Sequence, residues 1–156
     1  MDQQEIRAIY ARQVDTVYRV CYTYMGNATD TEDAVQDVFL KLIRSGQRFN
    51  DQEHEKAWLI RVAANHCKDL LKAASRKNSP LDAAPEPVAP VEELDTTREV
   101  VNSLEPKYRE VIYLYYYEGY SSAEIARMLG QPASTVRNNL HDARLILRSK
   151  LGGDWR

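Results

Sequence analysis

The sequence predicts an all-α protein built from two small helical domains. Apolar residues recur at three- and four-residue steps over most of the 156-residue chain, and this spacing places them on one face of a helix. No segment alternates apolar and polar residues as a half-buried strand does. A proline-rich stretch interrupts the helical pattern, so we expect residues 1–76 and 95–156 to form separate domains joined by a linker at residues 77–94.

The composition argues against several classes of protein. Apolar residues make up 44% of the chain and charged residues 28%, as in ordinary globular proteins, and no apolar run is long enough to insert into a membrane. The polar start, "MDQQEIRAIYARQVD", lacks the features of a secretory signal, so we expect a cytoplasmic protein. Two isolated cysteines, Cys21 and Cys67, predict buried thiols rather than a disulfide or a zinc site. Because no phosphate loop, metal-spaced cluster or paired nucleophile and base is present, we expect neither enzyme activity nor a cofactor.

The first helix of the N-terminal domain should end at Gly26, since a glycine commonly follows the last turn of a helix. Its spacing of 4-4-3-4-3 predicts one buried face. The residues on that face are Ile6, Tyr10, Val14, Val17, Cys21 and Tyr24.

The second helix is introduced by "TDTE", in which Thr29 should cap the helix and Glu32 should reach back to the cap. It is expected at residues 30–44. Its predicted core residues are Val35, Val38, Phe39 and Leu42. The opposite face is polar except for one leucine, and it consists of Asp33, Gln36, Asp37, Leu40 and Lys41.

The third helix, "EKAWLIRVAANHCKDLLKAASRK" at residues 55–77, has two contrasting faces. The face expected in the core carries Leu59, Val62, Ala63, His66 and Leu70. The other face carries Trp58, Arg61, Asn65, Lys68 and Lys72. An ordinary solvated face would be mostly Glu and Lys, whereas this face combines an aromatic ring, an amide and several cations.

The linker reads "KNSPLDAAPEPVAPVEEL" and contains four prolines. Prolines remove backbone donors and favour extended conformations, so the segment should be semi-rigid. It is also acidic, because residues 77–97 carry five acidic residues and one basic residue. Basic residues gather instead towards the C-terminal end of the chain.

The C-terminal domain should begin with a helix from about Thr96 to Leu104. A second helix is expected in "EPKYREVIYLYYYEGY", with Pro106 in its first turn and Gly119 at its end. This segment contains a cluster of tyrosines: Tyr113, Tyr115, Tyr116 and Tyr117. We expect these rings in the core with their hydroxyl groups at the surface, rather than stacked on bases.

The last 37 residues predict a helix-turn-helix. A short helix ends at Gly130, a turn contains Pro132, and Ser134 should cap the next helix. The core positions of that helix are Val136, Leu140, Ala143, Leu147 and Leu151. A solvated amphipathic helix is the alternative, but the glycine turn and the basic residues beside it favour DNA binding.

Three stretches in this order resemble bacterial RNA polymerase sigma factors of the extracytoplasmic-function group, which belong to the sigma-70 family. They are "TDTEDAVQDVFLKL", "KAWLIRVAANHCKDLLK" and "YSSAEIARMLGQPASTVRNNLHDARLILRSKL". The resemblance covers nearly the whole chain. It implies that residues 1–76 are region 2 of the family, which binds core RNA polymerase and opens the minus-ten promoter element, and that residues 95–156 are region 4, which reads the minus-35 element.

The resemblance also implies three sets of site residues. The polymerase-binding set is Asp33, Gln36, Asp37, Leu40 and Lys41. The minus-ten set is Arg48, Phe49, Trp58, Arg61, Asn65, Lys68 and Lys72, of which Asn65 and the loop residues Arg48 and Phe49 would form the pocket for a flipped base. The minus-35 set is Ser134, Thr135, Arg137, Asn138, His141, Arg144 and Arg148.

Two residues leave alternatives open. Trp58 could contact DNA, or it could pack beneath the loop that contains Phe49. Asp142 stands where many relatives carry a basic residue, so it either reads a cytosine amino group or marks a shifted promoter contact.

Two other functions compete with a sigma factor. A stand-alone helix-turn-helix activator would share residues 95–156, but it leaves the mixed aromatic and basic face of residues 55–77 unexplained. A sigma-mimicking protein that binds an anti-sigma factor would not need the Arg and Lys pattern in both halves. The resemblance further implies an anti-sigma factor as a regulatory partner.

Overall fold

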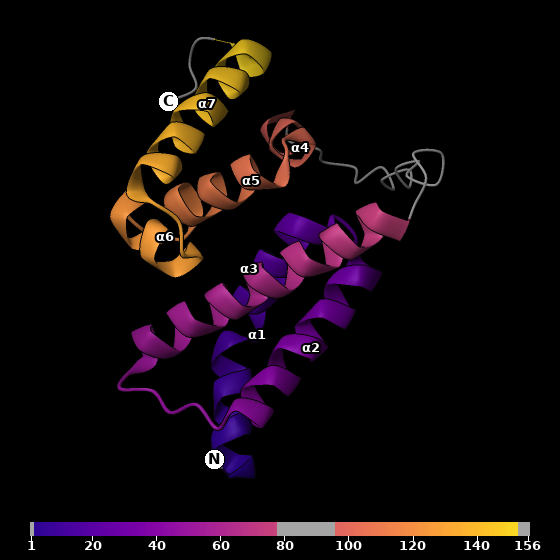
Figure 1. Cartoon of the computed structure of the whole chain (residues 1–156), viewed down its shortest axis with the longest axis vertical. Coiled ribbons are helices and arrows are strands. Elements are labelled where there is room, and N and C mark those ends of the chain that lie inside the picture. Colours follow the sequence, from indigo (N-terminus) through magenta and orange to yellow (C-terminus); the bar gives the residue numbers. More distant parts are fainter. Residues whose placement is uncertain (1, 78–95, 153–156) are drawn as a thin grey trace. The chain divides into compact units, whose positions relative to one another are not determined.

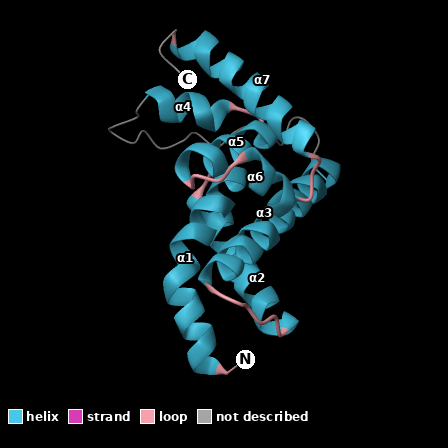
Figure 2. Cartoon of the chain, turned by 90° about the vertical axis from the view of Figure 1, so that its left-hand side faces the viewer, coloured by secondary structure: helices cyan, strands magenta, loops and turns pink. Residues whose placement is uncertain are grey.

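The computed structural model describes residues 2–77 and 96–152, and the chain divides into two compact units between Lys77 and Asn78. The predicted linker at residues 77–94 lies, apart from Lys77, outside the described residues. Every element within the described ranges is a helix, so the all-α prediction is confirmed (Figure 2).

Unit 1 consists of three long helices, α1 (Gln3–Met25), α2 (Ala28–Ser45) and α3 (Gln52–Lys77), with every pair in contact (Figure 1). Helix α1 ends at Gly26 as predicted, because this residue takes a left-handed φ of 76° that favours glycine. The predicted core residues of α2, namely Val35, Val38, Phe39 and Leu42, are all buried. In α1 the prediction holds for Val17, Cys21 and Tyr24, while Ile6 and Val14 are half-buried. It is wrong for Tyr10, which is 48% exposed and whose ring packs on Phe39.

The buried face of α3 is displaced from its predicted position. It consists of Leu59, Ile60, Ala63, Ala64 and Cys67. Val62 and His66 are only half-buried, and Leu70 is 37% exposed. The reason is that α3 packs against both α1 and α2, so its buried arc extends to the small side chains that fit between two neighbours.

Helix α2 starts earlier than the sequence suggested, and the predicted cap at Thr29 is wrong. Asn27 is the cap, because its side-chain oxygen accepts a hydrogen bond from the Asp30 backbone N–H at 2.8 Å. Its amide nitrogen also donates to the Asp30 carboxylate at 2.9 Å. Asparagine caps helices at least as well as threonine, so the helix begins after Asn27 rather than after Thr29.

Unit 2 contains α4 (Thr96–Ser103), α5 (Pro106–Ile112), the π-helix η1 (Tyr113–Tyr117), α6 (Ser122–Leu129) and α7 (Ala133–Leu151). Helix α7 is the centre of the unit and contacts α4, α5 and α6. Its buried residues are Val136, Leu140, Ala143 and Leu147, as predicted, whereas Leu151 is half-buried.

The tyrosine segment differs from the prediction of a single α-helix with buried rings. After Ile112 the chain forms a π-helix, in which only Leu114 is buried. Tyr116 and Tyr117 are exposed, and Tyr117 stacks on the half-buried ring of Tyr113. The wider π turn changes the direction of successive side chains. Tyr113 and Tyr115 are half-buried, and none of the four tyrosines is fully buried.

The helix-turn-helix is present, with one correction at its second helix. Helix α6 opens with a complete capping box between Ser121 and Glu124 and ends at Gly130, whose φ is 66°. Helix α7 then begins at Ala133, so the prediction that Ser134 caps it is wrong. The carbonyl of Pro132 already accepts the first helical hydrogen bond, from Val136 N–H at 3.3 Å, and Ser134 therefore lies exposed in the first turn.

Candidate nucleic-acid and polymerase interfaces

The face of α3 opposite its buried arc carries the side chains predicted to meet DNA. Arg61, Asn65 and Lys72 are exposed, while Trp58 and Lys68 are half-buried. The structure shows no hydrogen bond from the Asn65 amide to any described residue, so this amide is available to a ligand. The tight packing of Ala63, Ala64 and Cys67 behind this face fixes its direction.

The loop between α2 and α3, residues 46–51, lies beside this face, and we call it the capture loop. Gly46 ends α2 with a φ of 64°, a left-handed conformation. Phe49 then packs edge-on against Trp58, with 5.6 Å between the ring centroids. Contact between these two rings is expected if Trp58 packs under the loop. Arg48, next to Phe49, is exposed.

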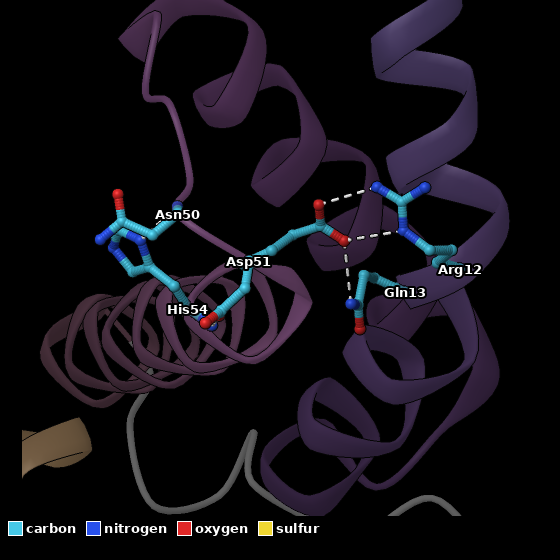
Figure 3. A network of polar contacts seen from close by, with 6 residues as sticks. Arg12, Gln13, Asn50, Asp51 and His54 are labelled. Atoms are coloured by element: carbon cyan, nitrogen blue, oxygen red, sulfur yellow. Dashed lines mark hydrogen bonds and ion pairs between the residues drawn. The ribbon is translucent and has the colours of Figure 1, made fainter.

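The start of α3 is held by a buried carboxylate. Glu55 is 4% exposed, and its two oxygens accept hydrogen bonds from Arg12 Nε at 3.1 Å and Arg12 Nη2 at 2.8 Å (Figure 3). Gln13 donates a third at 3.0 Å. Burial alone would raise the pKa of Glu55, but the bonds from Arg12 and Gln13 outweigh it and lower the pKa. These contacts fix the first turn of α3 to α1, and the sequence reasoning did not identify them.

The polar face of α2 presents an apolar patch. Asp33, Gln36 and Lys41 are exposed, and Leu40 is 44% exposed. Ile43, which the sequence reasoning missed, is 48% exposed and lies one turn after Leu40. Its three-residue spacing from Leu40 was the available signal.

Asp37 differs from the other predicted polymerase-binding residues. It is half-buried, and its carboxylate lies 3.0 Å from His66 Nε2 on α3. This contact ties α2 to α3.

On α7, most predicted minus-35 residues point outward. Ser134, Thr135, Arg137, Asn138, His141 and Arg148 are all exposed. Arg144 is different, because its Nε donates to Tyr116 Oη at 2.8 Å and its guanidinium lies 5.2 Å from the centre of the Tyr115 ring. Asp142 is exposed on this helix as well, and so is Leu145, which the sequence reasoning missed.

Other kinds of site find little support in the described residues. Cys21 and Cys67 are buried free thiols, as predicted, and a hydrogen bond with Cys67 together with burial raises the pKa of Cys21. No group of three or more potential metal ligands occurs in the described part of the chain. None of the helices at 2–77 and 96–152 is both long and apolar enough to span a bilayer.

Family models match both units. The model "Sigma-70 region 2" matches residues 9–77, and "Sigma-70, region 4" matches residues 94–147. The chain is 30% identical to the ECF RNA polymerase sigma factor SigW of Bacillus subtilis, over 96% of this chain and 90% of SigW. It is 31% identical to the ECF sigma factor SigE of Mycolicibacterium smegmatis, over 90% of this chain but only 59% of SigE.

Solved structures show the same fold. The sigma factor RpoE of Bartonella quintana, crystallised with the anti-sigma factor NepR, matches with a TM-score of 0.76 at 19% identity, over 97% of this chain and 99% of RpoE. CnrH, in complex with the cytosolic domain of CnrY, matches with a TM-score of 0.70 at 25% identity, over 98% of this chain and 91% of CnrH. This chain therefore belongs to the extracytoplasmic-function group of the sigma-70 family of RNA polymerase sigma factors.

Proposed function

We propose that this protein binds core RNA polymerase in the cytoplasm, directs it to specific promoters and helps to open the minus-ten element, without a cofactor or a catalytic step of its own. The observation that carries the proposal is the exposed face of α3 beside the capture loop. It combines the cation of Arg61, the amide of Asn65 and the rings of Phe49 and Trp58. The Asn65 amide has no hydrogen-bond partner among the described residues.

These groups match the requirements of strand opening. Cations at Arg61, Lys68 and Lys72 would follow the phosphates of one strand. A base that leaves the stack needs apolar contact and a hydrogen-bonding partner for its Watson–Crick edge. Phe49 would supply the first and Asn65 the second, with Arg48 at the exposed rim.

The face of α2 that carries Leu40 and Ile43 is the proposed docking site for core polymerase. Two neighbouring apolar side chains, each nearly half exposed, sit among Asp33, Gln36 and Lys41. An apolar centre within a polar rim is the usual make-up of a protein interface. Asp37 would act here mainly by holding α2 against α3.

Helix α7 is the proposed reader of the minus-35 element in the major groove. Arg137, Asn138 and His141 are exposed. Their side chains carry polar groups that can form hydrogen bonds with base edges. Arg148 would contact phosphate. Arg144 would do so only in part, because Tyr116 already accepts its Nε–H.

An anti-sigma factor is the proposed regulator. RpoE of Bartonella quintana and CnrH were each solved with a partner, NepR and the cytosolic domain of CnrY, and both share the fold of this chain. We therefore propose that this chain is also held inactive by a protein that covers one or both units.

Binding experiments separate the proposal from its two rivals. The full chain is mixed with core polymerase, and the complex is used to select duplexes from a random DNA library. A sigma factor should co-purify with core polymerase and enrich duplexes with two spaced elements. A helix-turn-helix activator would enrich DNA without core polymerase, and a sigma-mimicking protein would enrich no DNA in either case.

A further inference from the structure

We propose that His54 is a positioning residue that holds the capture loop in the conformation that receives the flipped base. The inference rests on the proposed function, because it assigns His54 a part in strand opening. His54 itself is not placed in contact with DNA. It would act through the backbone at Asn50 and the ring of Phe49.

His54 and the loop exchange two hydrogen bonds. Asn50 N–H donates to His54 Nδ1 at 3.1 Å, and His54 N–H donates to the Asp51 carboxylate at 2.8 Å. Figure 3 shows the side chains of these three residues. The pattern resembles a capping box in which the cap is Asp51 and the third helical residue is a histidine. Here the histidine accepts from the residue before the cap, so the reciprocal pair extends into the loop.

The imidazole also contacts the aromatic residue of the loop. Phe49 packs edge-on against His54 with 5.3 Å between ring centroids and an interplanar angle of 85°. The same ring meets Trp58 at 5.6 Å. Phe49 is therefore held by two rings that both belong to α3, and His54 is the one that simultaneously binds the loop backbone.

The first turn of α3, which carries His54, is anchored to α1. Its neighbour Glu55 is buried and receives three hydrogen bonds from Arg12 and Gln13 of α1. The first turn of α3 is thereby fixed to α1, so an anchor on that turn limits how far the loop can move. Arg48, whose side chain has no partner among the described residues, is presented to solvent by this anchored backbone.

The geometry requires one form of the imidazole. Nδ1 can accept from Asn50 only while it carries no proton, so the ring must be the neutral tautomer with its proton on Nε2. An asparagine at this position could offer its side-chain oxygen near the place of Nδ1. A phenylalanine would keep a ring for Phe49 but offer no acceptor.

The first test measures the hydrogen bond in the full-length protein. Amide exchange at Asn50 is followed by NMR in the wild type, His54→Asn, His54→Phe and the matched control Gln52→Ala, an exposed residue of the same turn. We expect exchange to become about fivefold faster in His54→Phe, as loss of one neutral hydrogen bond implies, and to stay near the wild-type rate in His54→Asn and the control. Equal exchange in His54→Phe and the wild type would overturn the inference.

The second test measures strand opening on a promoter selected with the wild-type protein and core polymerase. His54→Ala, which removes both the acceptor and the ring, should reduce open-complex formation about fivefold or more while leaving closed complexes unchanged, and His54→Asn should recover part of the loss. Asn65→Ala is run in parallel. If Asn65→Ala impairs opening and His54→Ala does not, the inference is wrong and the proposed function stands. If opening is normal in Asn65→Ala but impaired in His54→Ala, the proposed base contact of Asn65 is wrong and the inference stands, with the base contact in the capture loop. Normal opening in both variants would overturn the inference together with the proposed role of this face.

Discussion

Asn65 is the residue whose proposed role is most specific, because a short exposed amide can bond a base only after that base leaves the stack. We expect Asn65→Ala to preserve the fold, polymerase binding and closed complexes but to destabilise the open complex by about 1–3 kcal/mol. Permanganate footprinting measures this. A template with a mismatched minus-ten bubble should restore only part of the loss, since mismatching removes the unpairing cost but not the missing contact.

Normal opening by Asn65→Ala on duplex DNA would contradict this role. The base contact would then have to come from the capture loop around Phe49. The Asn65 side chain has no bond to a described residue, so a structural effect of the substitution on unit 1 is not expected.

Glu55 is the residue on which the stability of unit 1 should depend most clearly. Replacing it by Gln weakens two charged hydrogen bonds at a buried site, so we expect a loss of about 1–3 kcal/mol in the free energy of unfolding at pH 7. Urea denaturation followed by Trp58 fluorescence, in a Trp155→Phe background, reports this loss.

The pH dependence of that loss has a definite sign. The pKa of Glu55 is lowered in the folded protein, so its contribution is complete above the unfolded pKa of about 4.3 and is lost as the pH falls through the folded value. The difference between wild type and Glu55→Gln should therefore shrink below about pH 4. A difference that stayed constant down to acid pH would mean that the carboxylate charge does not stabilise unit 1.

At the scale of the element, the apolar patch on α2 gives a direct test of polymerase docking. Leu40→Asp should leave unit 1 folded, because Leu40 lies away from the core, but should weaken binding to core polymerase by about 2 kcal/mol or more. Leu70→Asp, at another exposed leucine of the same unit, is the matched control and should bind normally. Normal binding by a folded Leu40→Asp would remove this face of α2 from the interface.

Different residues of α7 should read bases and bind phosphates. Arg148→Gln is expected to weaken all promoters alike and to reduce the salt slope of binding by about one, whereas Asn138→Ala should change which promoters are preferred. Binding measured at several salt concentrations on two selected promoters separates the effects. A change of promoter preference in Arg148→Gln with none in Asn138→Ala would reverse the assignment.

The elements that were predicted well are those where local signals agree. The core of α2 and the core of α7 follow from helical spacing alone, and Gly26 and Gly130 mark helix ends because their backbones are left-handed. The buried arc of α3 could not be placed as well, since it depends on packing against two helices at once. The π-helix at Tyr113–Tyr117 has no simple sequence signature, and none of its tyrosines is buried.

On the exposed faces too, features that depend on local spacing were predicted and features that depend on long-range contacts were not. Exposure of Arg61, Asn65 and the predicted α7 residues other than Arg144 could be predicted because each lies away from a helical core stripe. The Glu55 network and the contact between Arg144 and Tyr116 join residues that are 28 or more positions apart, so no local pattern reveals them. His54 could not be predicted, because its proposed positioning role depends on a hydrogen bond to the backbone of the capture loop.

At the scale of the whole molecule, the proposal needs both units in one chain. Helix α3 would contact one promoter element weakly, and α7 would contact another weakly. Because the two units are covalently joined, the second contact is intramolecular, and the overall affinity for the promoter is much higher than that of either unit alone. The overall charge of −2 also fits this arrangement, since affinity for DNA would come from two local basic faces rather than from a generally basic surface.

Run-off transcription with purified core polymerase on a library of random promoters is the decisive experiment for sigma-factor activity of this chain. We expect transcripts that appear only when the full chain is present and that start downstream of a shared pair of elements. Asn138→Ala should change the preferred upstream element, and Asn65→Ala should impair opening. If core polymerase produces no chain-dependent transcript while the chain still binds DNA or polymerase, the chain is not a sigma factor, and an activator or a sigma-mimicking protein is favoured.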